Sequence, residues 1–148
     1  MFDNILIICV GNICRSPTAE VLLKHQLGDT NKIIHSAGLG ALVGKNIEPT
    51  ALEILQEHGI TPAQHVARQL TSSMLAEADL ILAMDRDNLA TLERLGSRSG
   101  LARRGDVRRF LQRDVPDPYY GGPEGFQTVF DMLDEGCDRL LRDLTQGV

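Results

Sequence analysis

An uninterrupted apolar run near the N-terminus, from Asn4 to Val10, constrains the fold more than any other feature of the chain. A run without polar alternation is typical of a central strand that is buried on both faces of a parallel sheet. Apolar residues then recur at helical spacing from Pro17 to Leu27 and stop at Gly28, a residue favoured at helix ends. The start of the chain therefore predicts a strand followed by a helix that covers it.

The rest of the chain continues this alternation of short apolar strands and amphipathic helices. The further elements that we expect are a strand over Lys32–His35, a Gly-rich loop over Ser36–Gly44, a helix over Pro49–His58, a short helix from Ser72 or Ser73 to Ala78, a strand over Asp79–Met84, a helix through Leu89–Leu95 that ends at Gly96, an edge strand over Asp106–Leu111 and a long helix over Glu124–Leu144. This order predicts a doubly wound α/β fold, a parallel sheet with helices on both faces and right-handed crossovers. No repeat or linker indicates a second domain, so residues 1–148 are expected to form one domain.

The segment between the first strand and the first helix carries candidate catalytic chemistry. Five residues separate Cys9 from Arg15, and a loop that short can turn its backbone N–H groups, the guanidinium and the sulfur toward one small space. Gly11 and Asn12 tolerate the left-handed backbone conformation that such a loop needs. The space suits a tetrahedral oxyanion.

The end of this loop favours anion binding further. Ser16 stands where a helix N-cap is preferred, and Pro17 stands where the first helical position accepts proline. The loop is therefore expected to end on a helix N-terminus, whose partial positive charge attracts anions. A thiol beside that terminus and an arginine favours its nucleophilic thiolate form. Cys9 is thus a candidate nucleophile for attack on phosphorus, whereas the alternative is a buried thiol of the core.

A proton donor for such a reaction is found near the C-terminus. Asp117 lies between Pro116 and Pro118, which stiffen its loop, and two tyrosines follow it. Apolar surroundings would keep this carboxyl protonated, as a general acid for the leaving group requires. The alternative interpretation is a simple Pro-Asp-Pro surface turn.

The segments Cys9–Glu20 and Asp117–Gly121 closely resemble the low molecular weight protein tyrosine phosphatases, and the resemblance spans essentially the whole chain. Ser36–Gly44 looks most like the bacterial branch that acts with tyrosine autokinases in exopolysaccharide export. The resemblance implies a four-stranded sheet of order 2-1-3-4. It also implies hydrolysis of phosphotyrosine through a phosphocysteine intermediate, with Cys9, Arg15 and Asp117 as catalytic residues.

The resemblance assigns further residues to the site. Substrate-binding positions are expected at Val10, Gly11, Asn12, Ile13, Cys14, Ser16, Leu39, Gly40, Tyr119 and Tyr120. Leu39 and Gly40 stand where many family members carry a large aromatic residue, so that wall should be thinner. Asn12, Ser36 and His65 are implied to support the loop by hydrogen bonds, although His65 could equally be an exposed or core histidine. Asp85 is most simply interpreted as a helix N-cap.

Two cysteines besides Cys9 allow different interpretations. Cys14 is placed either to form a reversible disulfide with an oxidised Cys9 or to pack beneath the loop. Cys137 falls on the apolar stripe of the last helix and is expected to pack there.

Two other functions are alternatives to that of a phosphatase. An arsenate reductase relays a disulfide through a further mobile cysteine, and Cys137 on a helix does not suit that role, so this function is disfavoured. A module that only binds phosphotyrosine needs neither a nucleophile nor an acid, so the presence of Cys9 and Asp117 argues against it.

Composition limits the partners and the compartment. The net charge is −5, and the only basic cluster is formed by Arg103, Arg104, Arg108, Arg109 and Arg113, so nucleic acid is not an expected partner. No signal peptide or membrane span is recognised, and three cysteines suit a reducing compartment, so we expect a cytoplasmic monomer without membrane insertion. No zinc spacing or nucleotide-binding loop occurs, so neither a metal nor a cofactor is expected. The expected partner is a phosphotyrosine protein, with a bacterial tyrosine autokinase as the candidate.

Overall fold

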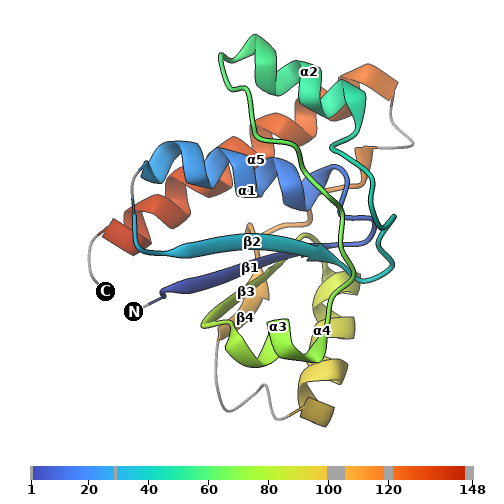
Figure 1. Ribbon diagram of the computed structural model, residues 1–148, viewed down its shortest axis with the longest axis vertical. Coiled ribbons are helices and arrows are strands. Elements are labelled where there is room, and N and C mark those ends of the chain that lie inside the picture. The colour runs from blue at the N-terminus through green and yellow to red at the C-terminus, as the bar shows by residue number, and fades with distance from the viewer. Residues whose placement is uncertain (1, 29, 100–105, 119–121, 146–148) are drawn as a thin grey trace.

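A computed structural model of the protein describes residues 2–28, 30–99, 106–118 and 122–145. These residues form three layers, with one parallel sheet between two layers of helices (Figure 1). The strands are β1 (Asn4–Cys9), β2 (Ile33–Gly38), β3 (Leu80–Ala83) and β4 (Asp106–Arg109). Their order is β2-β1-β3-β4, and every neighbouring pair is parallel. The predicted doubly wound fold and its 2-1-3-4 order are confirmed.

Helices cover both faces of the sheet (Figure 1). One face carries α1 (Arg15–Leu27), α2 (Pro49–Glu57) and α5 (Gly122–Thr145), and the other carries α3 (Ser72–Glu77) and α4 (Arg86–Ser99). None of the helices in the described ranges combines the length and the apolar content that crossing a membrane requires.

The central strand β1 divides its side chains between two cores. Ile5, Ile7 and Cys9 join the cluster that includes α1 and α5, whereas Leu6 and Ile8 join the cluster with α3 and α4. The four aliphatic residues from Ile5 to Ile8 are fully buried. Burial of each such side chain contributes about 1.5–3 kcal/mol to the free energy of folding, so β1 is held firmly in the sheet. Cys9, the last residue of this strand, is thereby placed at the carboxyl end of the sheet.

Several predicted boundaries were wrong because tertiary contacts outweigh local signals. β2 extends through Ser36, Ala37 and Gly38, which were expected in a loop, because these residues pair with the end of β1. α4 continues past Gly96 to Ser99. α1 begins at Arg15, two residues before the expected start, so Ser16 lies within the helix instead of capping it.

Candidate active site

A cavity of about 240 Å³ opens at the carboxyl ends of β1 and β2, the end of the sheet where parallel α/β folds place their ligands. Cys9 and Arg15 line it from the loop after β1. Asp117 lines it from the segment before α5, which is distant in the sequence. The structure therefore brings the three residues predicted to be catalytic to one cavity.

The loop after β1 is held by the buried side chain of Asn12. This residue adopts a left-handed conformation with φ of 57°, as predicted, and it is fully buried. Its Nδ2 donates to Ser16 Oγ at 2.8 Å and to Ser36 Oγ at 3.0 Å, while its Oδ1 accepts from the Arg68 backbone N–H at 3.0 Å. His65 Nε2 donates to the Asn12 carbonyl oxygen at 2.6 Å. The network predicted for Asn12, Ser36 and His65 is present, and Arg68 is an addition to it.

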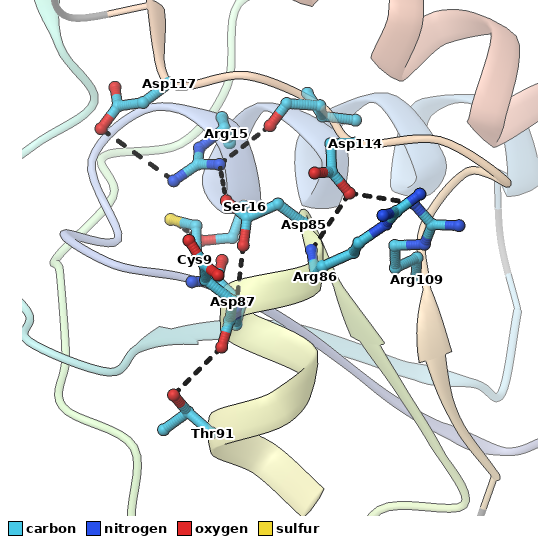
Figure 2. Close-up of polar contacts among 12 residues, drawn as sticks. Cys9, Arg15, Ser16, Asp85, Arg86, Asp87, Thr91, Arg109, Asp114 and Asp117 are labelled. Carbon is cyan, nitrogen blue, oxygen red and sulfur yellow. Dashed lines mark hydrogen bonds and ion pairs between the residues drawn. The ribbon is translucent and has the colours of Figure 1, made fainter.

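Cys9 Sγ lies 2.9 Å from Ser16 Oγ (Figure 2). Because Asn12 Nδ2 already donates to that oxygen, the hydroxyl proton of Ser16 is available for the sulfur. The Ser16 hydroxyl can therefore donate a hydrogen bond to the Cys9 sulfur, and a thiolate is stabilised by accepting one. The contact suits Cys9 as an anionic nucleophile.

Arg15 is held in position before any substrate arrives. Its guanidinium is buried, and Nη1 donates to Asp85 Oδ2 and to the Val115 carbonyl oxygen, both at 2.9 Å. Nη2 lies 4.0 Å from Asp117 Oδ2 (Figure 2). Asp85 Oδ1 also accepts from the Asn88 backbone N–H at 2.8 Å, so Asp85 caps α4, as predicted, and orients Arg15 as well.

The helix N-terminus beside the loop lacks a side-chain cap. The N-cap position is Cys14, which makes no capping hydrogen bond. The first N–H groups of a helix have no intrahelical partner, so those of Arg15 and Ser16 are suited to an anion. Burial, followed by the nearby charge of Cys9, raises the pKa of the Cys14 thiol far above its usual range. Cys14 is therefore a neutral thiol on the cavity wall.

The remaining walls of the cavity differ in part from the expected ones. Val10, Gly11, Ile13 and Gly40 line the cavity as expected, together with Leu42, Glu48 and Phe126. Leu39 does not lie on this wall but packs, partly buried, against the core under α3 and α4. Its neighbour Leu42 takes that place, with half of its surface exposed. Tyr119 and Tyr120 lie outside the described residues.

Leu42, Glu48 and Phe126 were not assigned to the cavity from the sequence. Leu42 stands in a Gly-rich stretch without periodicity and beside other apolar residues, so no local signal distinguishes it. Glu48 is the N-cap of α2, where its carboxylate accepts from the backbone N–H groups of Thr50 and Ala51. Pro49 marked the start of this helix, but glutamate is not among the preferred N-cap residues, so the role of Glu48 had no clear signal.

The third cysteine lies in the core where α5 packs against α1, and it does not line the cavity. Cys137 is fully buried on α5, and its Sγ contacts the Ala19 carbonyl oxygen at 3.6 Å. Burial raises the pKa of its thiol far above the usual range. Cys137 thus packs in the core, as predicted, and does not supply the mobile thiol of a disulfide relay.

The basic cluster of the sequence is engaged in local contacts. Arg109 pairs with Asp114 at 2.9 Å, and Arg113 pairs with Glu135 at 3.0 Å. The guanidinium of Arg108 lies 5.5 Å from the centre of the Phe2 ring. Arg103 and Arg104 lie outside the described residues. Arg109 and Arg113 are therefore held by local ion pairs, and Arg108 lies against an aromatic ring.

Comparison with known proteins agrees with this geometry. Residues 4–148 match the model of the family described as low molecular weight phosphotyrosine protein phosphatase. The low molecular weight protein-tyrosine-phosphatase Wzb of Escherichia coli K12 is 41% identical, over 97% of each chain.

Solved structures are similar over the same extent. The tyrosine phosphatase Wzb from Escherichia coli K30, in complex with sulphate, matches with a TM-score of 0.87 and 34% identity, over 97% of this chain and 99% of the other. The YwlE arginine phosphatase from Geobacillus stearothermophilus matches with a TM-score of 0.85 and 27% identity, over 97% of this chain and 94% of the other. The chain therefore belongs to the low molecular weight protein tyrosine phosphatase family and is a cysteine-dependent protein-tyrosine phosphatase.

Proposed function

We propose that the protein hydrolyses phosphotyrosine in a protein substrate through a phosphocysteine intermediate. The observation that carries this proposal is the convergence of Cys9, Arg15 and Asp117 on one cavity. A binding module would need the arginine and the helix N-terminus only. A nucleophile and a carboxyl group on the same cavity point to turnover.

In the first step, the phosphoryl group lies on the loop N–H groups and the Arg15 fork, which fixes it for in-line attack. Cys9 Sγ forms the bond to phosphorus as the bond from phosphorus to the tyrosine oxygen breaks. Asp117 gives its proton to that leaving oxygen, a contribution worth typically ~10²–10⁴-fold. The products of this step are a free tyrosine side chain and phosphocysteine.

In the second step, Asp117 takes a proton from a water molecule that attacks phosphorus. The bond between sulfur and phosphorus breaks, and Cys9 leaves as a thiolate. Ser16 Oγ, at 2.9 Å from Sγ, donates to that developing charge. Inorganic phosphate then leaves the cavity.

The proposed substrate is a tyrosine autokinase of polysaccharide export. Two similarities support it: the likeness of Ser36–Gly44 to the exopolysaccharide branch, and the 41% identity with Wzb in a match that covers 97% of the chain. The exposed apolar side chains of Val10 and Leu42 at the cavity would contact the tyrosine ring and its flanking residues. We further propose that residues 1–148 act as one cytoplasmic domain and as a monomer.

The covalent route is tested with Cys9→Ser and the matched control Cys137→Ala. The first variant is expected to lose turnover of 4-nitrophenyl phosphate but to keep phosphate binding, and the control is expected to keep both. Acid quenching during turnover by the wild type should leave one phosphoryl group on the peptide that contains Cys9, detected by mass spectrometry. Residual turnover by Cys9→Ser would overturn the covalent route.

A second candidate substrate is phosphoarginine, because two carboxylates, Asp117 and Glu48, line the same cavity. Carboxylates pair with the guanidinium group of an arginine substrate, whereas a tyrosine ring gains nothing from a second carboxylate in the cavity. The apolar side chains of Leu42, Ile13 and Phe126 favour the aromatic ring instead. The ratio of kcat/KM for phosphotyrosine and phosphoarginine peptides of one sequence decides between them.

A further inference from the structure

A second and larger cavity, of about 630 Å³, lies on the far side of the catalytic loop. It is formed by α1, by the middle of β2 and by the segment over residues 60–68, which crosses this side of the molecule (Figure 1). The two cavities share no lining residue. The family's reaction leaves this larger cavity without a role.

The chemistry of the larger cavity favours an anion. Its lining includes five basic side chains, Lys24, His25, His35, His65 and Arg68, and one acidic side chain, Glu20. Glu20 and Lys24 form an ion pair with each other at 2.7 Å, and the Glu20 carboxylate also accepts from Ser36 Oγ at 2.6 Å. Arg68 therefore carries the unbalanced positive charge of this lining, which contrasts with the net charge of −5 for the chain.

Arg68, one of the lining residues, is held in place by hydrogen bonds. Its Nε donates to the Ser36 carbonyl oxygen at 2.9 Å, and Nη2 donates to His35 Nδ1 at 2.6 Å. Because His35 Nδ1 accepts, the ring proton lies on Nε2, which donates to Asn4 Oδ1. A positioned guanidinium suits bidentate binding of a phosphate group.

Apolar side chains form another part of the lining. Val21, Ile60 and Pro62 lie there, and Val66 exposes 59% of its surface. A ring or other apolar body joined to a phosphate group would contact these residues while its anionic end met the basic ones. The volume lies within the usual range for small-molecule sites.

The same lining residues hold the catalytic loop. Ser36, His65 and Arg68 each bond to Asn12, through its Nδ2, its carbonyl oxygen and its Oδ1 respectively. Asn12 in turn donates to Ser16, the hydrogen-bond partner of Cys9. A ligand in the larger cavity would therefore contact the groups that set the conformation of the loop.

We propose that the larger cavity binds a small phosphorylated molecule, and that its occupancy is coupled through Asn12 to anion binding at the Cys9 loop. Each ligand then changes the affinity for the other by the same factor. The site would make the phosphatase responsive to the concentration of a phosphorylated metabolite.

The binding site is tested by calorimetric titration with ADP, with benzylphosphonate present to occupy the catalytic cavity. The variants are Ala63→Asp, which adds a negative charge at an exposed lining position, and Ala63→Asn, its uncharged match. ADP is expected to bind one site in the wild type and in Ala63→Asn, and at least about tenfold more weakly in Ala63→Asp. Equal affinity in the two variants, or no binding to the wild type, would overturn the proposal.

The coupling is tested by measuring the affinity for each ligand with and without a saturating amount of the other. We expect a change of at least about threefold, equal for both ligands, that Ala63→Asp removes. If benzylphosphonate simply displaces ADP, then ADP occupies the catalytic cavity and the second site is refuted. If neither affinity changes, the coupling is refuted. These measurements need no turnover, so they stand apart from the proposed reaction.

Discussion

Replacing Gly38 with alanine should damage the catalytic loop without touching any catalytic group. Gly38 ends β2 and pairs with Cys9, and the chain passes so close that an added Cβ would overlap the carbonyl oxygen of Val10. The same Cβ would lie 3.1 Å from both Cα and Cβ of Ala41. These neighbours are backbone or the short side chain of alanine, so no rotamer change relieves the overlap.

The expected magnitude follows from this overlap. The Val10 carbonyl must retreat by roughly 1 Å to restore an ordinary van der Waals separation. Val10 follows the nucleophile directly, and a misplacement of about 1 Å at a catalytic centre lowers rates by about 10²-fold. Overpacking of this kind costs about 2 kcal/mol of folding free energy.

The assay compares Gly38→Ala with Gly40→Ala, whose added Cβ would meet only Val10 Cγ1, at 3.9 Å. For Gly38→Ala we expect kcat/KM for 4-nitrophenyl phosphate to fall about 10²-fold and the thermal midpoint to fall by about 5 °C. Gly40→Ala should stay within about threefold of the wild type. Near-normal activity of a folded Gly38→Ala protein, or an equal loss in Gly40→Ala, would refute the steric argument.

Three further predictions test the acid, the wall and the titrating groups. Asp117→Asn should slow phenyl phosphate, a poor leaving group, by at least ~10² while slowing 4-nitrophenyl phosphate much less, and equal losses would move the acid role to another residue. Leu42→Ala should raise KM for aryl phosphates about three- to tenfold with little change in kcat, and an unchanged KM would remove Leu42 from the binding wall. Burial, with the charge of Arg68, lowers the pKa of His35, so the unfolded chain binds a proton that the folded chain excludes, and stability should fall below about pH 6.5. Burial raises the pKa of Cys14 and Cys137, so the unfolded chain releases protons that the folded chain keeps, and stability should also fall above about pH 9. Urea unfolding across this range checks both limbs, and His35→Gln should flatten only the acid one.

The architecture was predictable because its signals are local and strong. The apolar run of β1, the helix stop at Gly28 and the stripe of α5 each identify an element without reference to the rest of the chain. The spacing of Cys9 and Arg15 predicted that the loop brings the sulfur and the guanidinium to one space, because five intervening residues allow few backbone conformations. The family resemblance supplied the strand order, which periodicity alone does not contain.

The remaining details depend on contacts between distant segments. Ser36 and Gly38 look like loop residues until they are paired with β1. Leu42, not Leu39, reaches the cavity because the chain turns after Gly38, and no periodic pattern records that turn. Asp85 has a capping signal in the sequence, but its ion pair with Arg15 spans 70 residues and only the fold reveals it.

The division of β1 between two cores gives the sheet a strict parity. Residues at odd positions from Ile5 to Cys9 enter one layer, and those at even positions enter the other. Deleting or inserting one residue within this strand would swap the two sets and aim the sulfur at the wrong side of the sheet. A change in the length of β1 is therefore forbidden, because it would carry Cys9 to the face of the sheet that α3 and α4 cover (Figure 1).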